Sequence, residues 1–458
     1  MTTNKVSDDT EISSSNLLDE KDHLNDLEHC EHSANEMLHL EANFFYRWFG
    51  PIRSGSLRGS TFAMASITFG GGCLAFPYAV MQCGPIVGLI IFLICGLCSY
   101  YTLKILLDDG VKAKILDYNQ LLEHTQGKGM VTFSDINNII MCIGIIMSYQ
   151  LTVYRFAAQL GHKYFSLDLD EGINKLILMG VCFVCIQVPL SLLKNISTLQ
   201  YASLVGTFAL VYSIVVIVAE APFYMTRYLE KGGEIPWFRP ISWGWLDTFS
   251  TFMFGFASHN GIFQVFTELK RPSVIRYYKV LDRSFIIEII VYVSIAFGGF
   301  FSTFLETKDV FLDRKDLEGF IDIPVQIAKI SLFVCLHCTM AINYNIMRMS
   351  FKSMFFDGGD IPFFKDLSMV VFIYILSNSA VYYISNVTQI LGIIGGFCTI
   401  VLCFINPILI HLKLGDKDKE KNKLDRALSW GIMIFVTFFG CAATLKSLIY
   451  PIVYPKKN

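Results

Sequence analysis

The chain has 458 residues, of which 53% are hydrophobic, 14% are aromatic and 17% are charged. Soluble domains carry about 25% charged residues, and the apolar residues here come in long blocks, which excludes a nucleic acid-binding protein, a secreted disulfide scaffold and a coiled coil. The formal net charge of −2 conceals an uneven distribution, because residues 1–45 hold 11 acidic and 2 basic residues whereas the remainder holds 28 acidic and 35 basic residues. We therefore expect an acidic soluble tail joined to a basic membrane-embedded body.

The tail, residues 1–45, contains acids, serines and four histidines but no apolar stretch typical of a signal peptide. Low hydrophobicity with high net charge does not supply a core, so we expect this segment to be disordered. Because the histidines are irregularly spaced among acids, a solvated tail is favoured over a metal site. Such a tail could bind cytoplasmic regulators.

The rest of the chain, residues 46–458, is predicted to be an all-α polytopic membrane domain. A helix needs about 20 apolar residues to cross a bilayer. Eleven segments meet this requirement: 60–80, 85–107, 134–156, 174–193, 197–220, 246–267, 284–305, 322–346, 367–385, 388–412 and 430–450.

The distribution of basic residues predicts the orientation of these segments. If the N-terminus is cytoplasmic, the tail and the cytoplasmic loops hold 24 Lys and Arg, against 11 on the opposite side. Cytoplasmic loops are usually enriched in basic residues. We therefore expect a cytoplasmic N-terminus and a C-terminus on the other side.

Two of the eleven segments contain residues that interrupt a helix. The first contains Gly70, Gly71 and Gly72 followed by Pro77, and the sixth contains the run 254–262 with three polar side chains and two glycines. Glycine and proline weaken helical hydrogen bonding. In lipid, freed backbone groups are tolerated only where they line a cavity inside the protein. We therefore predict that both segments are broken helices at a binding site.

Interrupted segments at matching positions of two halves indicate an inverted-repeat transporter. The repeats would be residues 60–220 and 246–412, with 430–450 as an additional helix. The N–H groups at a half-helix start near Gly71, Gly72 and Cys73 could hold a carboxylate, and the carbonyls near Phe256 and Ala257 could hold an ammonium group or a cation. Both features together suit a zwitterion, and hence an amino acid.

At these residues the chain resembles the amino acid/auxin permease family of the amino acid–polyamine–cation superfamily. The resemblance rests on residues 55–60 leading into the glycine-rich segment with residues 76–79, and on residues 256–263 followed by residues 267–270. It covers about residues 53–450. It implies eleven helices in a five-plus-five inverted-repeat (LeuT-type) fold, with helices 1 and 6 broken, and movement of amino acids coupled to protons or sodium.

The resemblance and the breaks together indicate the site residues. The predicted substrate-binding residues flank the two breaks: Thr68, Gly70, Gly71, Gly72, Cys73, Phe256, Ala257, Ser258, His259 and Asn260. The cation-site candidates are Ser66, Phe69 and Thr339, because Thr339 resembles a threonine of sodium-coupled members. Those members tend to carry an asparagine where this chain has Ser66, so we expect proton coupling, with sodium as the alternative.

Ionisable residues inside a membrane are candidates for function. His259 lies in the second break and is the candidate for proton coupling, although a neutral hydrogen-bonding role is equally compatible with its position. Glu220 and Arg155 lie at outer helix ends and could gate access. Glu288, like Lys329 and Lys446, is expected near a helix end, where a charge can reach an interface, and is interpreted as structural. Tyr149 and Tyr154 could close the pocket, although packing is the favoured interpretation.

The chain has no nucleotide-binding glycine loop with its lysine, and no catalytic apparatus, metal site or cofactor is expected. We therefore predict a secondary active transporter of small neutral amino acids that works by alternating access. A sensor that signals through the tail, and a channel or lipid-handling protein, remain alternatives. The sequence is compatible with the plasma membrane and with a vacuolar or lysosomal membrane.

Overall fold

The computed structural model describes residues 55–193, 196–314, 322–356, 359, 361–384, 386–415 and 423–453. Almost all of them belong to the second of two units in the chain, Leu57–Asn458. The described residues form helices and no β-strand, which confirms the predicted all-α class. The predicted tail, residues 1–45, lies outside the described residues.

The first half of the described chain begins with an interrupted helix and continues with four long ones. The interrupted helix consists of α3 (Leu57–Thr68), the 3₁₀ turn η1 (Gly71–Ala75) and α4 (Phe76–Cys83). The long helices are α5 (Pro85–Ala113), α7 (Lys128–Phe165), α8 with η2 and α9 (Gly172–Cys182, Phe183–Gln187, Val188–Leu192) and α10 (Ile196–Glu230), with the short α6 (Tyr118–Gln126) between α5 and α7.

The second half follows the same order of elements. It begins with α11 (Gly244–Gly255), η3 (His259–Gly261) and α12 (Ile262–Thr267). Next come α13 (Val274–Thr303), the short turns η4 (Phe304–Glu306) and η5 (Phe311–Asp313), α14 (Ile323–Phe355) and α15 (Phe363–Tyr383). The last are α16 (Val387–Ile393), the π-helical turns η6 (Ile394–Cys398) and η7 (Val401–Ile405), α17 (Asn406–Leu414) and α18 (Lys423–Val453).

Each predicted span coincides with helix, but the count of eleven is not established. Among the described residues, nine helices are long and apolar enough to cross a membrane. A tenth span is the pair Leu57–Thr68 and Gly72–Cys83, bent by 55°. The predicted sixth span is divided between α11, with 12 residues, and α12, with 6. At 1.5 Å per residue, neither piece alone reaches the roughly 30 Å of a bilayer core.

Polar caps fix several helix starts that hydropathy places less well. The side chain of Asp117 accepts a hydrogen bond from Gln120 N at the start of α6, and Asp322 accepts one from Val325 N at the start of α14. Ser273 caps α13 by accepting from Arg276 N. Such caps satisfy N–H groups that have no partner inside the helix. As a result α13 begins ten residues before the predicted start at 284, in a charged stretch that hydropathy assigns to a loop.

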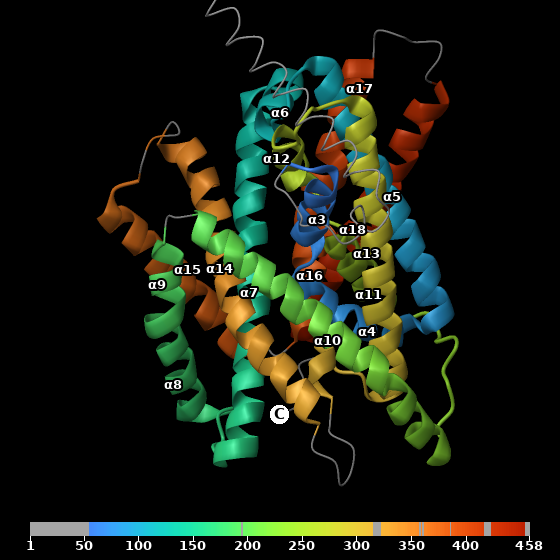
Figure 1. Ribbon diagram of the computed structural model, residues 1–458, viewed down its shortest axis with the longest axis vertical. Helices are drawn as coiled ribbons and strands as arrows, with labels where there is room; N and C mark the ends of the chain where they lie inside the picture. The colour runs from blue at the N-terminus through green and yellow to red at the C-terminus, as the bar shows by residue number, and fades with distance from the viewer. Residues whose placement is uncertain are drawn as a thin grey trace, which may run out of the picture. The chain divides into compact units, whose positions relative to one another are not determined.

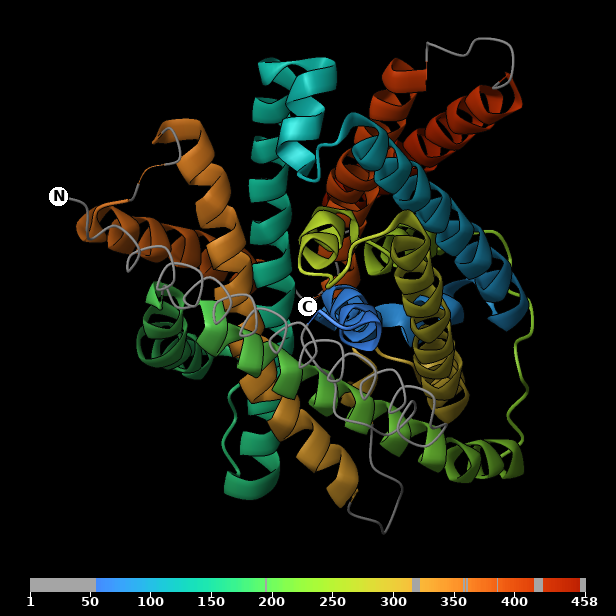
Figure 2. The ribbon, with the colours of Figure 1, turned by 45° about the horizontal axis from the view of Figure 1, so that its top comes forward.

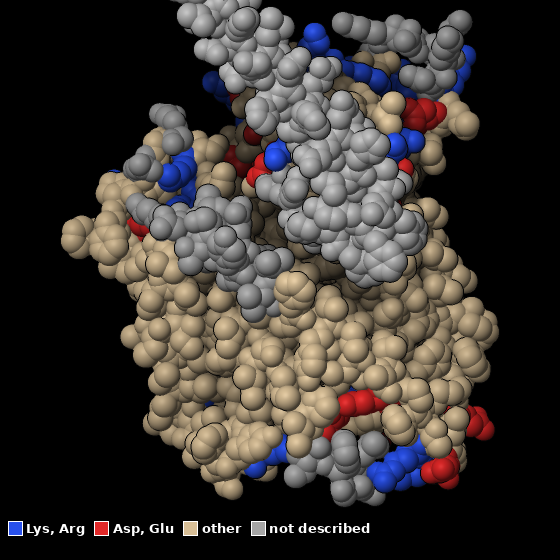
Figure 3. Space-filling view, viewed as in Figure 1, with Lys and Arg blue, Asp and Glu red and all other residues tan. Residues whose placement is uncertain are grey.

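The two interrupted helices lie inside the helical unit. Helices α3 and α4 pack on α13, and α4 also packs on α11. Around them, α14 packs against α7 and α10, and α10 crosses α13 (Figures 1 and 2). On the face drawn in Figure 3, charged side chains gather at the two ends and leave an uncharged band between them, as expected of a multi-pass membrane protein.

Candidate functional site

The first break separates α3 from the half-helix formed by η1 and α4. Helix α3 ends at Thr68, and Gly70 has the extended backbone angles φ −115° and ψ 174°. The Gly70 amide donates to the Thr68 carbonyl at 2.8 Å, and no side chain caps the start of η1. The first N–H groups of a helix have no partner within it and attract anions. An uncapped helix start and a carbonyl helix end therefore meet at Phe69 and Gly70.

The second break follows α11 and is held by hydroxyl groups of α5. Ser99 Oγ donates to the Phe256 carbonyl at 2.9 Å, and Thr102 Oγ1 lies 2.9 Å from His259 Nε2. The Ala257 amide returns to the Phe254 carbonyl at 3.1 Å, so the backbone turns away from the helix axis at this point. Hydrogen bonds to α5 therefore replace part of the helical ladder that the break removes.

Glycines allow the two interrupted helices to pack closely. A Cβ atom at Gly72 would overlap the ring of Phe254, and a Cβ at Gly255 would overlap the ring of Phe76. Each helix thus places an aromatic ring where its partner has a glycine. Only a residue without a side chain permits this approach.

Tyr292 of α13 links the carbonyl ends of both interrupted helices. Its hydroxyl lies 2.7 Å from the Thr68 carbonyl oxygen and 2.9 Å from the Gly255 carbonyl oxygen. A tyrosine hydroxyl has one proton to donate, so the two carbonyls share it. Its ring packs edge-on against Phe69, Phe76 and Phe256, with centroids 4.9–5.8 Å apart. Tyr292 thus brings two negative helix ends to one point, and the sequence prediction missed it.

Glu288 is a second residue whose position the sequence reasoning placed wrongly. It was expected near a helix end, but it is the fifteenth of the thirty residues of α13 and is only 3% exposed. Thr68 Oγ1 donates to its Oε1 at 2.8 Å, at the last turn of α3. The error follows from the earlier start of α13. Lys329 and Lys446 do lie towards helix ends, where Lys329 donates to Gln159 Oε1 and Lys446 pairs with Asp247.

Several predicted substrate-binding residues lie at the breaks, but they differ in whether they are buried or exposed. A Cβ at Gly70 would lie 3.0 Å from the Tyr149 hydroxyl, so Tyr149 of α7 lies against the first break. Cys73 Sγ donates to the Gly70 carbonyl at 2.9 Å. Ser258 is 1% exposed, and its hydroxyl has no hydrogen-bond partner within the described part of the chain. Asn260, by contrast, is exposed and faces Asn138 of α7 at 3.4 Å.

The cation-site candidates are not joined by any hydrogen bond among the described residues. Thr339 Oγ1 donates to the Cys335 carbonyl of its own helix at 2.9 Å. Ser66 and Phe69 are half-buried, the first on α3 and the second directly after it. A role of the three residues in binding sodium stays a prediction.

The imidazole of His259 is buried against α5. Its Nδ1 has no partner within the described residues, whereas Nε2 meets Thr102. A neutral ring that carries its proton on Nε2 satisfies this arrangement, since a doubly protonated ring would bury an unpaired N–H donor. The geometry therefore favours a neutral ring that anchors the break.

Two ion-pair clusters lie at the helix ends predicted to be outside. Arg155 of α7 pairs with Asp309 at 2.6 Å and with Asp313 at 3.5 Å, and Asp309 also accepts from Val387 N at the start of α16. This cluster ties α7, the 304–314 segment and α16 together. Burial raises the pKa of Asp313 to about 6, against the opposing effect of Arg155.

In the second cluster, Arg314 pairs with Glu220 of α10 and with Asp322, the latter at 2.8 Å. Burial alone would raise the pKa of Asp322, but the Val325 N–H and Arg314 lower it below its usual value. Arg155 and Glu220 were expected at outer helix ends, but α7 continues to Phe165 and α10 to Glu230. Each residue connects its helix to the segment between α13 and α14.

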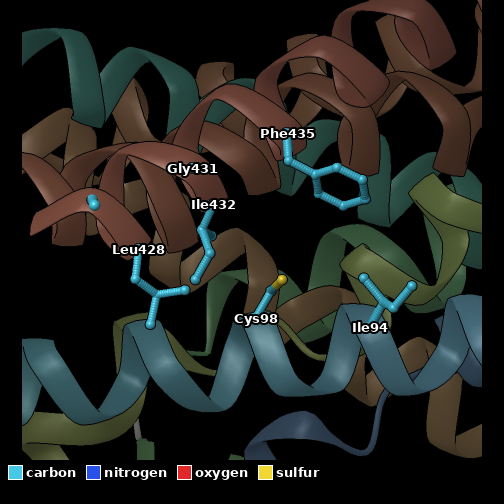
Figure 4. Close-up of a pocket in the computed structure, with 7 residues that line it drawn as sticks. Ile94, Cys98, Leu428, Gly431, Ile432 and Phe435 are labelled. Carbon is cyan, nitrogen blue, oxygen red and sulfur yellow. The ribbon is translucent and has the colours of Figure 1, made fainter. Parts of the chain in front are cut away.

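A groove of about 380 Å³ lies between α5 and α18 and is lined by apolar residues (Figure 4). Ile94 and Cys98 come from α5, and the other lining residues lie between Ala427 and Phe435 of α18. None of them belongs to a break. Its apolar lining suits lipid rather than a zwitterion.

Comparison with known proteins places this geometry in a family. A family model described as transmembrane amino acid transporter protein matches residues 53–450. The putative amino acid transporter AAT1 of Plasmodium berghei is 21% identical over 446 residues, which cover 87% of this chain and 71% of the relative. Putative sodium-coupled neutral amino acid transporter 10 of Xenopus laevis is 23% identical, and the match covers 80% of this chain but only 35% of that relative.

Two further matches come from yeast and from a solved structure. Vacuolar amino acid transporter 6 of Saccharomyces cerevisiae is 23% identical over 54% of this chain and 55% of the relative. A crystal structure of a manganese transporter from Eremococcus coleocola is 11% identical and covers 88% of each chain with a TM-score of 0.49. Because the family model covers most of its length, this chain belongs to the transmembrane amino acid transporter family and is a multi-pass membrane protein rather than an enzyme.

Proposed function

We propose that this chain is a secondary active transporter of small neutral amino acids, coupled to protons, that works by alternating access. The observation that carries the proposal is the meeting of two interrupted helices whose end groups are of opposite sign, the uncapped start of η1 and the carbonyl ends of α3 and α11. The uncapped start of η1 at Gly70 offers N–H groups for a carboxylate. The carbonyl end of α11, at Gly255, accepts one hydrogen bond from Tyr292 and keeps a second lone pair for an ammonium group.

The surroundings of the breaks support a small neutral side chain on the substrate. Ser258 supplies a buried hydroxyl that has no partner in the described part of the chain, and Phe69, Phe256 and Tyr292 supply aromatic surface. Among the described residues at the breaks, none carries a charge that could pair with a charged substrate side chain apart from Glu288, which Thr68 engages. The predicted binding residues Gly70, Gly71, Gly72, Cys73, Ala257, His259 and Asn260 belong to this proposal.

Sodium coupling is the second candidate, because relatives from several vertebrates are named sodium-coupled neutral amino acid transporters. The predicted sodium ligands Ser66, Phe69 and Thr339 would then have to converge. Proton coupling is favoured because the carboxylate of Glu288 lies beside the first break, whereas Thr339 bonds within its own helix. The yeast relative named for the vacuole is compatible with a vacuolar or lysosomal membrane.

Uptake into proteoliposomes tests the proposal. The purified full-length chain is reconstituted and given labelled L-alanine, L-serine or L-glutamine with an imposed pH gradient, sodium gradient or neither. Accumulation driven by the pH gradient is the expected result. Binding of a labelled amino acid without accumulation under any gradient would favour the sensor, and no binding of any amino acid would overturn the proposal.

A further inference from the structure

We infer that Glu288 is the group that binds the coupling proton, and that the Thr68 hydroxyl transmits its protonation state to the first break. This inference rests on the proposed function, since it names the residue through which that function uses a proton gradient. It replaces His259, the residue predicted from the sequence, in that role.

Glu288 is an ionisable side chain that is buried without a counter-charge in the described part of the chain. Glu288 is 3% exposed at the middle of α13, and no Lys, Arg or His pairs with it in the described part of the chain. A buried carboxylate is strongly disfavoured unless a cation pairs with it or a proton neutralises it. Ionisable residues at this depth in a membrane are retained for function by default.

The charged side chains of the elements that pack against α13 do not pair with Glu288 in the described part of the chain. Helix α13 packs against α3, α4, α5, α10, η1 and η4. Among the described residues, none of the charged side chains on these elements hydrogen-bonds to Glu288 or pairs with it: Arg58, Lys104, Asp108, Asp109, Lys112, Glu220, Arg227, Glu230 and Glu306. The titratable groups that contact the same break are of types that are uncharged at neutral pH: Cys73, Tyr149 and Tyr292.

The hydroxyl of Thr68 has fewer protons than acceptors around it. Its hydroxyl has one proton but lies within hydrogen-bonding distance of two acceptors, Glu288 Oε1 at 2.8 Å and the Met64 carbonyl at 3.2 Å. With an ionised Glu288, Thr68 can satisfy only one of them. With a protonated Glu288, the carboxyl group donates to Thr68 Oγ1, and Thr68 donates to the Met64 carbonyl. The observed spacing therefore accommodates one additional proton.

Thr68 connects Glu288 to the proposed substrate site. The Thr68 carbonyl accepts from the Gly70 amide and from Tyr292, so this residue ends α3 and begins the break. A proton that enters from water on one side neutralises Glu288 and frees the Thr68 hydroxyl for its own helix. When the proton leaves to the other side, the Thr68 hydroxyl must turn towards the carboxylate. Proton binding thereby changes the last turn of α3, next to the proposed carboxylate-binding end.

His259 is less suited to the role. Its Nε2 is occupied by Thr102 and its Nδ1 faces no acceptor among the described residues, so a second proton would be buried without a partner. Thr102 in turn lies on α5 rather than at either helix end. A substitution of His259 is therefore included in the experiment beside the substitution of Glu288.

The test is carried out with the full chain in proteoliposomes and labelled L-alanine. Two readings are taken from each protein: counterflow, which requires substrate binding and exchange across the membrane but no ion gradient, and accumulation driven by a pH gradient. For one proton per substrate, one pH unit drives about tenfold accumulation. The variants are Glu288→Gln, whose amide can still donate to Thr68, His259→Gln, and Glu123→Gln as an exposed-carboxylate control on α6.

We expect Glu288→Gln to retain counterflow while its pH-driven accumulation falls from about tenfold to onefold, and Glu123→Gln to keep both. Whatever rate of counterflow His259→Gln retains, the pH gradient should still drive about tenfold accumulation in this variant. Proton uptake on substrate binding, followed with a pH indicator in detergent, should also disappear in Glu288→Gln alone. Glu288→Asp keeps a carboxylate and should retain coupling, which guards against a loss of folding in the amide variant.

The outcomes separate this inference from the proposed function. Wild type that lacks counterflow with every amino acid of the panel contradicts the proposed function and the inference together. Wild type that is driven by the pH gradient, with a Glu288→Gln variant that accumulates equally well, overturns only the inference. Loss of coupling in His259→Gln with full coupling in Glu288→Gln would also overturn it.

Discussion

Removal of the Tyr292 hydroxyl tests whether the two helix ends must be held together for the substrate site to form. Tyr292→Phe keeps the ring and its contacts with Phe69, Phe76 and Phe256. It removes the one donor shared by the Thr68 and Gly255 carbonyls. Thr68 keeps its bond from the Gly70 amide, whereas Gly255 loses the hydrogen bond that the structure gives its carbonyl.

The magnitude follows from the unequal loss at the two carbonyls. A buried acceptor left without its donor costs about 1–3 kcal/mol. Because Thr68 retains a partner, the penalty is expected from Gly255 alone. If the hydroxyl holds the breaks in their binding geometry, the affinity for the amino acid should fall by about 5- to 150-fold. Equilibrium binding of labelled L-alanine to the purified protein measures the change.

Tyr278→Phe is the matched control for this experiment. Tyr278 lies on the same helix, and its hydroxyl bonds to Asp108 of α5 rather than to a break. The control removes the same group from the same element and should bind L-alanine with wild-type affinity. Wild-type affinity in Tyr292→Phe, or an equal loss in Tyr278→Phe, would refute the role assigned to the Tyr292 hydroxyl.

Three further substitutions test other parts of the structure. Gly72→Val should abolish L-alanine uptake because its side chain overlaps the Phe254 ring, whereas Gly129→Val, which meets no neighbour, should transport normally. Arg348→Met leaves Asp366 buried without its partner at 2.9 Å, which should cost about 3–5 kcal/mol and reduce the yield of monodisperse protein in size-exclusion chromatography. Asp313→Asn tests a titration: burial raises the pKa of Asp313 to about 6, so the folded state takes up a proton as the pH falls through 6. The melting temperature of wild type should therefore rise relative to the variant between pH 7 and pH 5, and parallel curves would contradict this.

Sequence patterns predicted the positions of the helices well, because membrane spans are defined by long apolar runs and breaks by glycine and polar residues. The eleven predicted segments all fall on helices. Helix starts were less accurate where a cap and charged residues extend a helix into a polar stretch. Ser273 starts α13 ten residues early and thereby moves Glu288 from a helix end to its middle.

The contacts of the site could be predicted only in part. The glycines and the polar run 256–260 mark both breaks, but Tyr292 lies in an ordinary apolar helix and gives no signal of its own among 21 tyrosines. Its role depends on which residues of α13 face the breaks. This orientation is set by packing between distant segments, since Thr68 lies more than 200 residues from its partners on α13. Ser99 and Thr102 were missed for the same reason.

Gradient-driven uptake by the purified full-length chain tests the proposed transport function most directly. Proteoliposomes with an inward pH gradient, no sodium and labelled L-alanine, L-serine or L-glutamine should accumulate at least one of these amino acids above the external concentration. Collapse of the pH gradient with a protonophore should return the internal concentration to the external level. Equilibration without accumulation, or accumulation that survives the protonophore and requires sodium, would contradict proton-coupled transport.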